Sequence, residues 1–167
     1  MAGQNTIKVT KYSDVIEEKV AAAAITPGML LELTNVGQVQ THSVAGGNAL
    51  IRFALEDELQ GGAIGDAYSA ADQVQVWIPY RGDIVQAILA DGNDIVIGDY
   101  VESDGNGYVQ EHTTDADSWE SAEPGGIAVY PNQIIGQALE AVDTSGSSGE
   151  ESSLVLGYAR RILIRIV

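Results

Sequence analysis

The sequence ITPGMLLELTNVGQVQTH at residues 25–42 returns as IVIGDYVESDGNGYVQEH at residues 95–112. The two copies align without a gap at an offset of 70 residues and are identical at seven of eighteen positions. Self-similarity at a fixed offset is the sequence signature of a repeated structural unit. The chain is therefore expected to contain two similar halves. The identical positions are Ile25/Ile95, Gly28/Gly98, Glu32/Glu102, Gly37/Gly107, Val39/Val109, Gln40/Gln110 and His42/His112.

Each copy is typical of a β-hairpin. The first copy contains the short apolar strand MLLEL, the turn TNVG and the returning strand QVQTH, in which apolar and polar residues alternate. The second copy contains DYVES, DGNG and YVQEH in the same order. Gly, Asn and Asp tolerate the positive φ that tight turns need, so DGNG is a strong hairpin signal. The shared glycines indicate that the backbone geometry is repeated.

Weaker similarity extends the repeat beyond the hairpins. FALEDE at residues 53–58 resembles QALEAV at residues 137–142, and VQVWIPYRGDI at residues 74–84 resembles LVLGYARRILI at residues 154–164, which aligns Arg81 with Arg161. Neither half contains a long amphipathic helix. The sequence predicts a mainly β chain, a small β-barrel or β-sandwich body built from halves at about 20–90 and 91–167.

The segment before the repeat is expected to be an extended N-terminal arm, residues 1–19, preceding a body at residues 20–167. It is polar at its start, and TIKVTKY then alternates like a strand. The following DVIEEKVAAAAI is ambiguous, because its glutamates and alanines favour a helix whereas its β-branched residues fit a strand. We favour the strand.

Composition excludes several kinds of chemistry. The 167 residues are 45% hydrophobic, which allows a real core, and include no cysteine. The chain therefore has no disulfide framework, no thiol nucleophile and no thiolate metal site. The N-terminus lacks the apolar region of a secretory signal, and the longest clean apolar stretch, VAAAAI, is too short to span a bilayer. We expect a soluble chain or a component of an assembly.

The charge is strongly negative. There are 24 Asp and Glu against 8 Lys and Arg, which gives a net charge of −16. Phosphate binding needs clustered Lys and Arg, so neither nucleic acid nor an anionic membrane is an expected partner. The acidity fits adaptation to high salt, where charge repulsion is screened over about 3 Å. It also fits a plain acidic surface that keeps the protein soluble.

No residue constellation predicts an enzyme or a cofactor. His42 and His112 fall on equivalent repeat positions, but only Glu111 provides a nearby ligand, and a polar residue at a strand end is ordinary. Nucleophile-elbow, dinucleotide-binding and phosphate-loop motifs do not occur. We expect no catalytic residue, no metal and no cofactor. Spaced acids that could suggest Ca²⁺ lack the twelve-residue loop pattern and better fit surface turns: Asp83, Asp91, Asp94 and Asp99.

The phrases KVAAAAITPGMLLELTNVGQVQTHS, FALEDELQGGAIGDAYSAADQVQVWIPYRGD, IVIGDYVESDGNGYVQ and IIGQALEAV, in this order, resemble capsid decoration (head cement) proteins of tailed viruses. The resemblance covers most of the chain from about residue 19. It implies a structural virion protein that binds the major capsid protein on the outer capsid surface, at symmetry or local symmetry axes, often as a homotrimer. The acidity and the insertion at residues 113–126 depart from plainer family members; the acidity suggests a hypersaline host.

This interpretation assigns residues to two contacts. The arm would meet acidic groups of the capsid through Lys8, Lys11 and Lys19, together with Tyr12. The subunit interface would use Trp77, Tyr80 and Arg81. The apolar C-terminus, RRILIRIV, is expected to be buried in the body or in an interface.

Two other functions are considered. A turret, spike or adhesin-type β module could bind host-surface carbohydrate by stacking Trp119 on sugar rings beside its acidic loop. A β-barrel enzyme could use a pair of carboxylates, but no pair is marked in so acidic a chain. Glycan binding that depends on Trp119 would favour the first of these, and regular occupancy of a capsid lattice would favour the decoration protein.

Overall fold

The computed structural model describes residues 5–12, 14–113, 131–146, 152–153 and 158–167. In these ranges the regular structure is β, apart from the single 3₁₀ turn η1 (Glu58–Gln60), which confirms the predicted mainly β class. The strands are β1 (Lys8–Thr10), β2 (Ile16–Val20), β3 (Leu31–Leu33), β4 (Val39–Thr41), β5 (Phe53–Ala54), β6 (Gln73–Trp77), β7 (Ile84–Ile88), β8 (Asp94–Ile95), β9 (Tyr100–Ser103), β10 (Val109–Glu111), β11 (Gly136–Ala138), β12 (Val142–Asp143), β13 (Ser152–Ser153), β14 (Tyr158–Ala159) and β15 (Arg161–Ile166).

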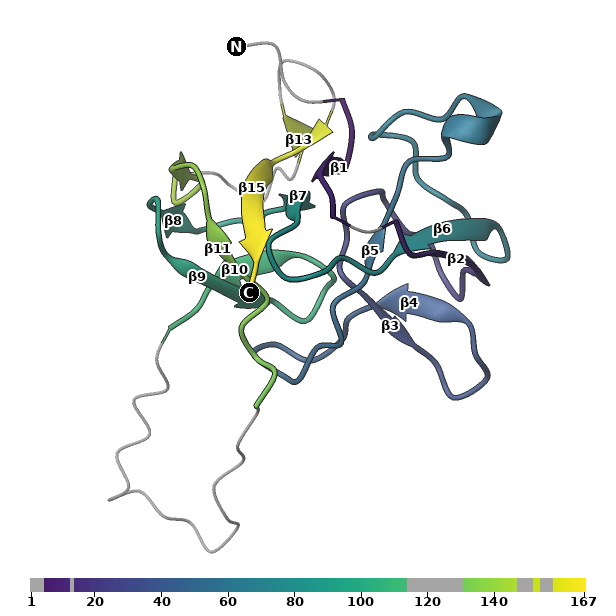
Figure 1. Ribbon diagram of the computed structural model, residues 1–167, viewed down its shortest axis with the longest axis horizontal. Coiled ribbons are helices and arrows are strands. Elements are labelled where there is room, and N and C mark those ends of the chain that lie inside the picture. Colours follow the sequence, from purple (N-terminus) through teal and green to yellow (C-terminus); the bar gives the residue numbers. More distant parts are fainter. Residues whose placement is uncertain (1–4, 13, 114–130, 147–151, 154–157) are drawn as a thin grey trace, which may run out of the picture.

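The strands form two groups that lie side by side (Figure 1). The first half contains the sheet β2-β6-β5 and the hairpin β3-β4, which an antiparallel bridge between Leu30 and Phe53 joins to β5. The second half contains the six-stranded sheet β1-β7-β15-β11-β9-β10. It thus begins at β7, before the expected boundary at about residue 90, and takes β1 from the expected arm. The pairs in these sheets are antiparallel.

The repeated hairpins have the same register in both halves, as the sequence predicts. Glu32 of β3 lies opposite Gln40 of β4, and Glu102 of β9 lies opposite Gln110 of β10. In each pair the glutamine Nε2 donates to the glutamate Oε1, at 2.6 Å in the first half and 3.0 Å in the second. The repeat therefore preserves a cross-strand side-chain contact as well as the backbone turn.

The long strands of the two halves also correspond, but not as the sequence alignment suggests. Trp77 of β6 pairs with β2 and β5, and in the second half Arg165 of β15 pairs with the equivalent strands β7 and β11. Trp77 thus corresponds to Arg165, and the predicted alignment of residues 74–84 with 154–164 is wrong. An alternating strand keeps the same side chains facing inward after any even shift, so its pattern alone does not fix the register.

Each half folds back so that the end of its first strand meets the returning strand of its hairpin. A parallel bridge joins Ala21, just after β2, to Val39 of β4, and the equivalent bridge joins Leu89, just after β7, to Val109 of β10. Next to these bridges, Ala22 N donates to Val39 O at 2.8 Å. The same curvature in both halves follows from the repeated pairing.

The core is mostly aliphatic and is continuous between the halves. One cluster of buried side chains includes Phe53 and Trp77 from the first half and Val85, Ile162 and Ile164 from the second. A second cluster, which contains Val39 and Val76, lies in the first half. Because residues of both halves enter one cluster, the body cannot separate into two lobes without exposing apolar surface to water.

Part of the predicted arm packs on the body. β1 pairs with β7, and Ile7 is fully buried, with its N–H 3.2 Å from the carboxylate of Glu56. β2 is an integral strand, as favoured over a helix, and pairs with β6 along its length. The described part of the predicted arm is therefore not a free extended segment, because Ile7 packs in the shared core. Residues 1–4 and 13 lie outside the described ranges.

The C-terminal strand lies inside the sheet. β15 is flanked by β7 and β11, and Ile162 and Ile164 are fully buried. The expectation that RRILIRIV is buried in the body is therefore confirmed.

Candidate functional site

The two halves meet where the second hairpin inserts its turn into the first half. Gly107 donates its N–H to His42 O at 3.1 Å and accepts a hydrogen bond from Leu30 N at 2.7 Å. Gly107 is buried, with a φ of +86°, and a Cβ atom added there would lie 2.8 Å from Thr41 Cβ. Only glycine fits this approach, because the site requires both a left-handed backbone and the absence of a side chain. We call this pair of backbone groups, the donor Leu30 N and the acceptor His42 O, the first acceptor site, because it receives the inserted turn.

A buried polar cluster lies beside this joint. Glu102 is 4% exposed and accepts hydrogen bonds from Gln110 Nε2 at 3.0 Å, from Gln133 Nε2 at 3.0 Å and from His112 Nδ1 at 2.6 Å. A buried carboxylate without partners is strongly destabilising, so these three donors make its burial possible. The cluster holds the segment that follows residue 130 against the hairpin of the second half.

The two repeated histidines have different partners. His42 contacts Ser103 Oγ at 2.8 Å and Asn48 O at 3.0 Å, whereas His112 contacts Glu102. Each histidine thus has a structural hydrogen-bonding role at the end of a hairpin strand. Among the described residues, no group of three or more His, Cys, Asp or Glu could hold a metal ion.

The spaced aspartates lie in separate elements, with Asp94 in β8 and Asp83 and Asp99 in two different turns. Asp83 is fully buried and accepts hydrogen bonds from Tyr12 N at 2.6 Å and from Tyr80 N at 2.7 Å. Asp99 accepts a hydrogen bond from Val96 N at 2.9 Å. Asp99 is thus a turn acceptor at the surface, as expected. For Asp83 the expectation of a surface turn is wrong, because its carboxylate is buried and is satisfied by two backbone N–H groups.

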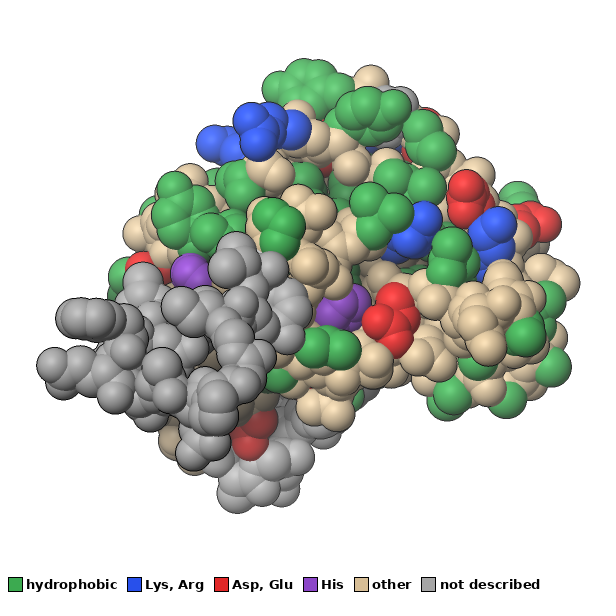
Figure 2. Space-filling view, turned by 90° about the horizontal axis from the view of Figure 1, so that it is seen from below, with side chains coloured by type: hydrophobic (Ala, Val, Ile, Leu, Met, Phe, Trp, Pro, Cys, Tyr) green, Lys and Arg blue, Asp and Glu red, His purple; other side chains and the backbone are tan. Residues whose placement is uncertain are grey.

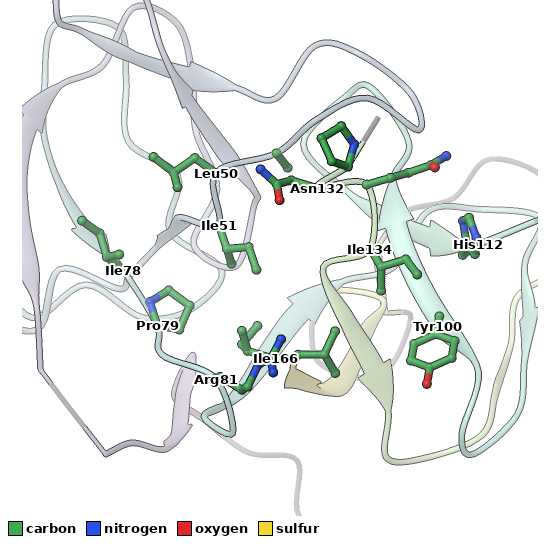
Figure 3. A pocket seen from close by; sticks show the side chains of 14 residues that line it. Leu50, Ile51, Ile78, Pro79, Arg81, Tyr100, His112, Asn132, Ile134 and Ile166 are labelled. Atoms are coloured by element: carbon green, nitrogen blue, oxygen red, sulfur yellow. The ribbon is translucent and has the colours of Figure 1, made fainter. Parts of the chain in front are cut away.

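A groove of about 680 Å³ lies between the halves. Figure 3 shows first-half residues such as Leu50 and Ile78 on one side of it, and Ile134, Tyr100 and His112 on the other. Hydrophobic side chains also gather on the underside of the molecule (Figure 2). The lining residues are Ala49, Leu50, Ile51, Ile78, Pro79, Arg81, Tyr100, His112, Pro131, Asn132, Gln133, Ile134, Ile166 and Val167.

The groove combines exposed apolar side chains with a cation. Leu50 is 65% exposed and Tyr100 is 47% exposed, although both are large. Contiguous exposed apolar residues of this kind mark interaction surfaces more often than single ones do. Arg81 lines the same groove and has no ion pair among the described residues. The groove is the best candidate for a protein-binding surface in the described part of the chain.

The lysines assigned to capsid contact are paired within the chain. Lys8 and Lys11 both contact the carboxylate of Asp14, and the hydrogen bond from Lys11 is the main cause of a lowered pKa for Asp14. Lys19 lies 3.5 Å from Glu17. Their contact with a capsid remains a prediction. Exposed pairs of this kind contribute little stability, so a partner with its own acids could take them over.

The remaining predicted contact residues divide between surface and core. Tyr12 is 79% exposed and Tyr80 is also exposed, and Arg81 lines the groove. Trp77 is fully buried in the shared core, so its assignment to a subunit interface is wrong. Alternation along a strand does not show which of its two faces is buried, and in β6 the side chain of Trp77 lies on the buried face. Trp119 and most of the 113–126 loop lie outside the described residues.

Sequence reasoning missed Leu50, Tyr100 and Ile134 as groove residues. The repeat did carry a signal for one of them, because Tyr100 replaces the apolar Leu30 at the equivalent position. Leu50 and Ile134 lie in segments between strands, where periodicity gives no guide to exposure.

No helix in the described residues is both long enough and apolar enough to cross a membrane.

Comparisons with known proteins give a match at the level of the fold. No family model matches the chain, and neither does any curated protein. Among solved structures, the chain is similar to the head fiber gp8.5 N base of bacteriophage phi29, with a TM-score of 0.52 and 13% sequence identity. The match covers 93% of this chain and 95% of that one. The two chains therefore share a fold along nearly their whole lengths.

Proposed function

We propose that this chain is a structural virion protein that decorates and stabilises the outer surface of an icosahedral tailed-virus capsid. It would bind the major capsid protein at symmetry or local symmetry axes as a homotrimer. The observation that carries the proposal is the fold shared with a head fiber base over almost all of both chains. The resemblance of its sequence phrases to capsid decoration proteins supports the same class.

The physical properties of the body agree with this role. The core is continuous between the halves, and Gly107 of the second half is hydrogen-bonded to Leu30 and His42 of the first. A decoration subunit needs such a body because it must not deform when the shell beneath it is under pressure. It also needs an apolar surface for its neighbours, and the groove between the halves offers one.

The lysines near the N-terminus supply a docking chemistry for the shell. Lys8 and Lys11 share Asp14 at the surface, and exposed ion pairs exchange partners easily. Carboxylates on the shell could compete for the two ammonium groups. Such a contact would depend on salt, because exposed charges are screened beyond about 3 Å in molar salt.

The test is co-sedimentation of the purified protein with undecorated, expanded capsids at several salt concentrations. We expect saturation at a fixed ratio to the major capsid protein. A variant with Lys8→Glu and Lys11→Glu should bind more weakly. A variant with Arg160→Glu and Arg165→Glu changes the net charge by the same amount outside the assigned contacts and serves as the control for a general charge effect. Absence of binding by the unaltered chain at every salt concentration would count against the proposal.

A further inference from the structure

The joint between the halves has a counterpart that no described residue fills. The equivalents of Leu30 and His42 are Tyr100 and His112. His42 N donates to Leu30 O at 2.9 Å, and His112 N donates to Tyr100 O at 2.8 Å. In an ideal antiparallel pair, Leu30 N would also donate to His42 O, and Tyr100 N would donate to His112 O. In the first half Gly107 replaces this reciprocal bond by bonding to both Leu30 N and His42 O.

In the second half the reciprocal bond, from Tyr100 N to His112 O, is also absent from the described structure. Both residues line the groove. Leu30 is fully buried by the inserted turn, whereas Tyr100 is 47% exposed. We call the groups Tyr100 N and His112 O the second acceptor site. Like the first acceptor site, it is flanked by the hydrogen bond from the histidine N–H to the carbonyl of the facing residue, but no described glycine is inserted in it.

The turn that would fit is also present. Gly37 is the equivalent of Gly107, and its φ of +82° is close to the +86° of Gly107. It lies at the exposed tip of the β3-β4 hairpin, and a Cβ atom added there would meet nothing within 4 Å. Gly37 N donates to Thr34 O at 3.0 Å, whereas Gly107 uses its N–H for His42. The β3-β4 tip thus has the bonding of a free turn.

A chain cannot easily place this tip in its own second acceptor site, because the two belong to different halves whose relation is fixed by the first joint and the shared core. We propose that the β3-β4 tip of one copy inserts into the groove of a second copy, with Gly37 bonded to Tyr100 N and His112 O as Gly107 is bonded to Leu30 N and His42 O. The contact between copies repeats the contact between halves.

This arrangement is head-to-tail, because the tip and the groove are different surfaces. Such contacts close into a ring when the rotation between copies allows it, and otherwise propagate. The inference rests on the self-association included in the proposed function, and it names the surfaces involved. Every copy carries a charge of −16, so we expect the contact to be tighter in molar salt than in dilute buffer.

The tip is tested with three glycine variants of the full chain. Gly37, Gly61 and Gly92 all have positive φ and open space around a new Cβ atom. Alanine should therefore strain each turn to a similar degree. Sedimentation velocity over a range of protein and salt concentrations should show that Gly37→Ala raises the dissociation constant of self-association by about tenfold or more. Gly61→Ala and Gly92→Ala should leave it unchanged.

The groove is tested through the backbone of Tyr100. Tyr100 is the first residue of β9, a position where proline is tolerated, and its N–H lies on the same side of the strand as its carbonyl, which accepts from His112 N and faces away from β11. Tyr100→Pro removes that N–H and should abolish association. Tyr100→Leu keeps the N–H and places the equivalent residue of the first half there, so it should associate normally. Thermal unfolding of each variant shows whether it is folded.

A mixture of variants tests the direction of the contact. Gly37→Ala retains an intact groove and Tyr100→Pro retains an intact tip, so the two together should form a heterodimer and nothing larger. A chain that is monomeric at every concentration and salt would overturn the inference, as would equal effects of the three glycine variants or a mixture without heterodimer. None of these measurements uses capsids. Failure of capsid binding with intact self-association would therefore count against the proposed function alone.

Discussion

Glu32 and Glu102 occupy equivalent positions in the two halves and have opposite surroundings. Each accepts a hydrogen bond from the glutamine on the facing strand. Glu32 also accepts a hydrogen bond from Ser43 Oγ at 2.7 Å and stays partly exposed, whereas Glu102 is buried against His112 and Gln133. The repeated glutamate stabilises only its own hairpin in the first half. In the second half it also bonds to the segment that contains Gln133.

This difference predicts unequal effects of the same substitution. Glu102→Ala would leave the donors of three side chains without their acceptor in a buried site, and we expect a loss of about 3 kcal/mol in the free energy of unfolding. Glu32→Ala, its matched control, should lose about 1 kcal/mol. Urea unfolding at one salt concentration measures both. Equal losses would show that the buried cluster contributes no special stability.

The two hairpin glycines make a second matched pair. Gly37→Ala and Gly107→Ala both force a side chain into a left-handed backbone, which costs about 1–2 kcal/mol. At Gly107 the new Cβ atom also meets Thr41, so overpacking adds about 1–3 kcal/mol. Unfolding in dilute buffer at low protein concentration should therefore rank Gly107→Ala as the less stable variant. The reverse order would contradict the tight joint between the halves.

Tyr68 predicts a change of stability at alkaline pH. Burial raises the pKa of Tyr68 to about 12, and its hydroxyl donates to Leu55 O at 2.8 Å. The folded state thus favours the neutral phenol, whose ordinary pKa is about 10. Its contribution to stability is fully present below pH 10 and is lost as the pH rises towards 12.

Tyr68→Phe should therefore lose about 1 kcal/mol at neutral pH and show a smaller further loss between pH 10 and 12 than the unaltered chain. Chemical unfolding across this pH range measures the difference. Tyr100→Phe is the control, since Tyr100 is half exposed and its hydroxyl makes no hydrogen bond within the described residues. Parallel curves for the Tyr68 variant and the unaltered chain would contradict the prediction.

Salt should stabilise the fold. With a net charge of −16, repulsion among carboxylates opposes compaction in dilute buffer, and molar salt screens it. We expect Tm to rise steeply from dilute buffer to molar potassium or sodium chloride. A variant with Glu58→Lys and Asp91→Lys, two exposed carboxylates, should show a smaller rise. A Tm that does not respond to salt would contradict adaptation to high salt.

Local patterns in the sequence were sufficient for the hairpins and insufficient for the contacts between them. Glycine-containing turns and alternation predicted both hairpins because turn chemistry and strand period act over a few residues. Alternation could not set the register of β15, since an even shift leaves the same side chains facing inward. It also could not tell that Trp77 faces the core.

The candidate site was predicted only in part for a related reason. Arg81 was expected at an interface and lines the groove, but Leu50 and Ile134 come from segments far apart in the chain. Their proximity depends on how the halves dock, which in turn depends on the approach of Gly107 to Leu30. Nothing in the repeat itself distinguishes a turn that inserts from a turn that stays exposed.

The place of β1 has a kinetic consequence. β1 leaves the ribosome before the other described strands, yet it pairs with β7, whose other edge is covered by the much later β15. The strands of the first half can pair during synthesis. The sheet of the second half cannot form until β1, β7 and β15, which are far apart in the sequence, have all been made. Pairing between distant segments slows folding. The early strand must stay unpaired meanwhile, so we expect refolding of the whole chain to be limited by the assembly of β1, β7 and β15 rather than by either hairpin.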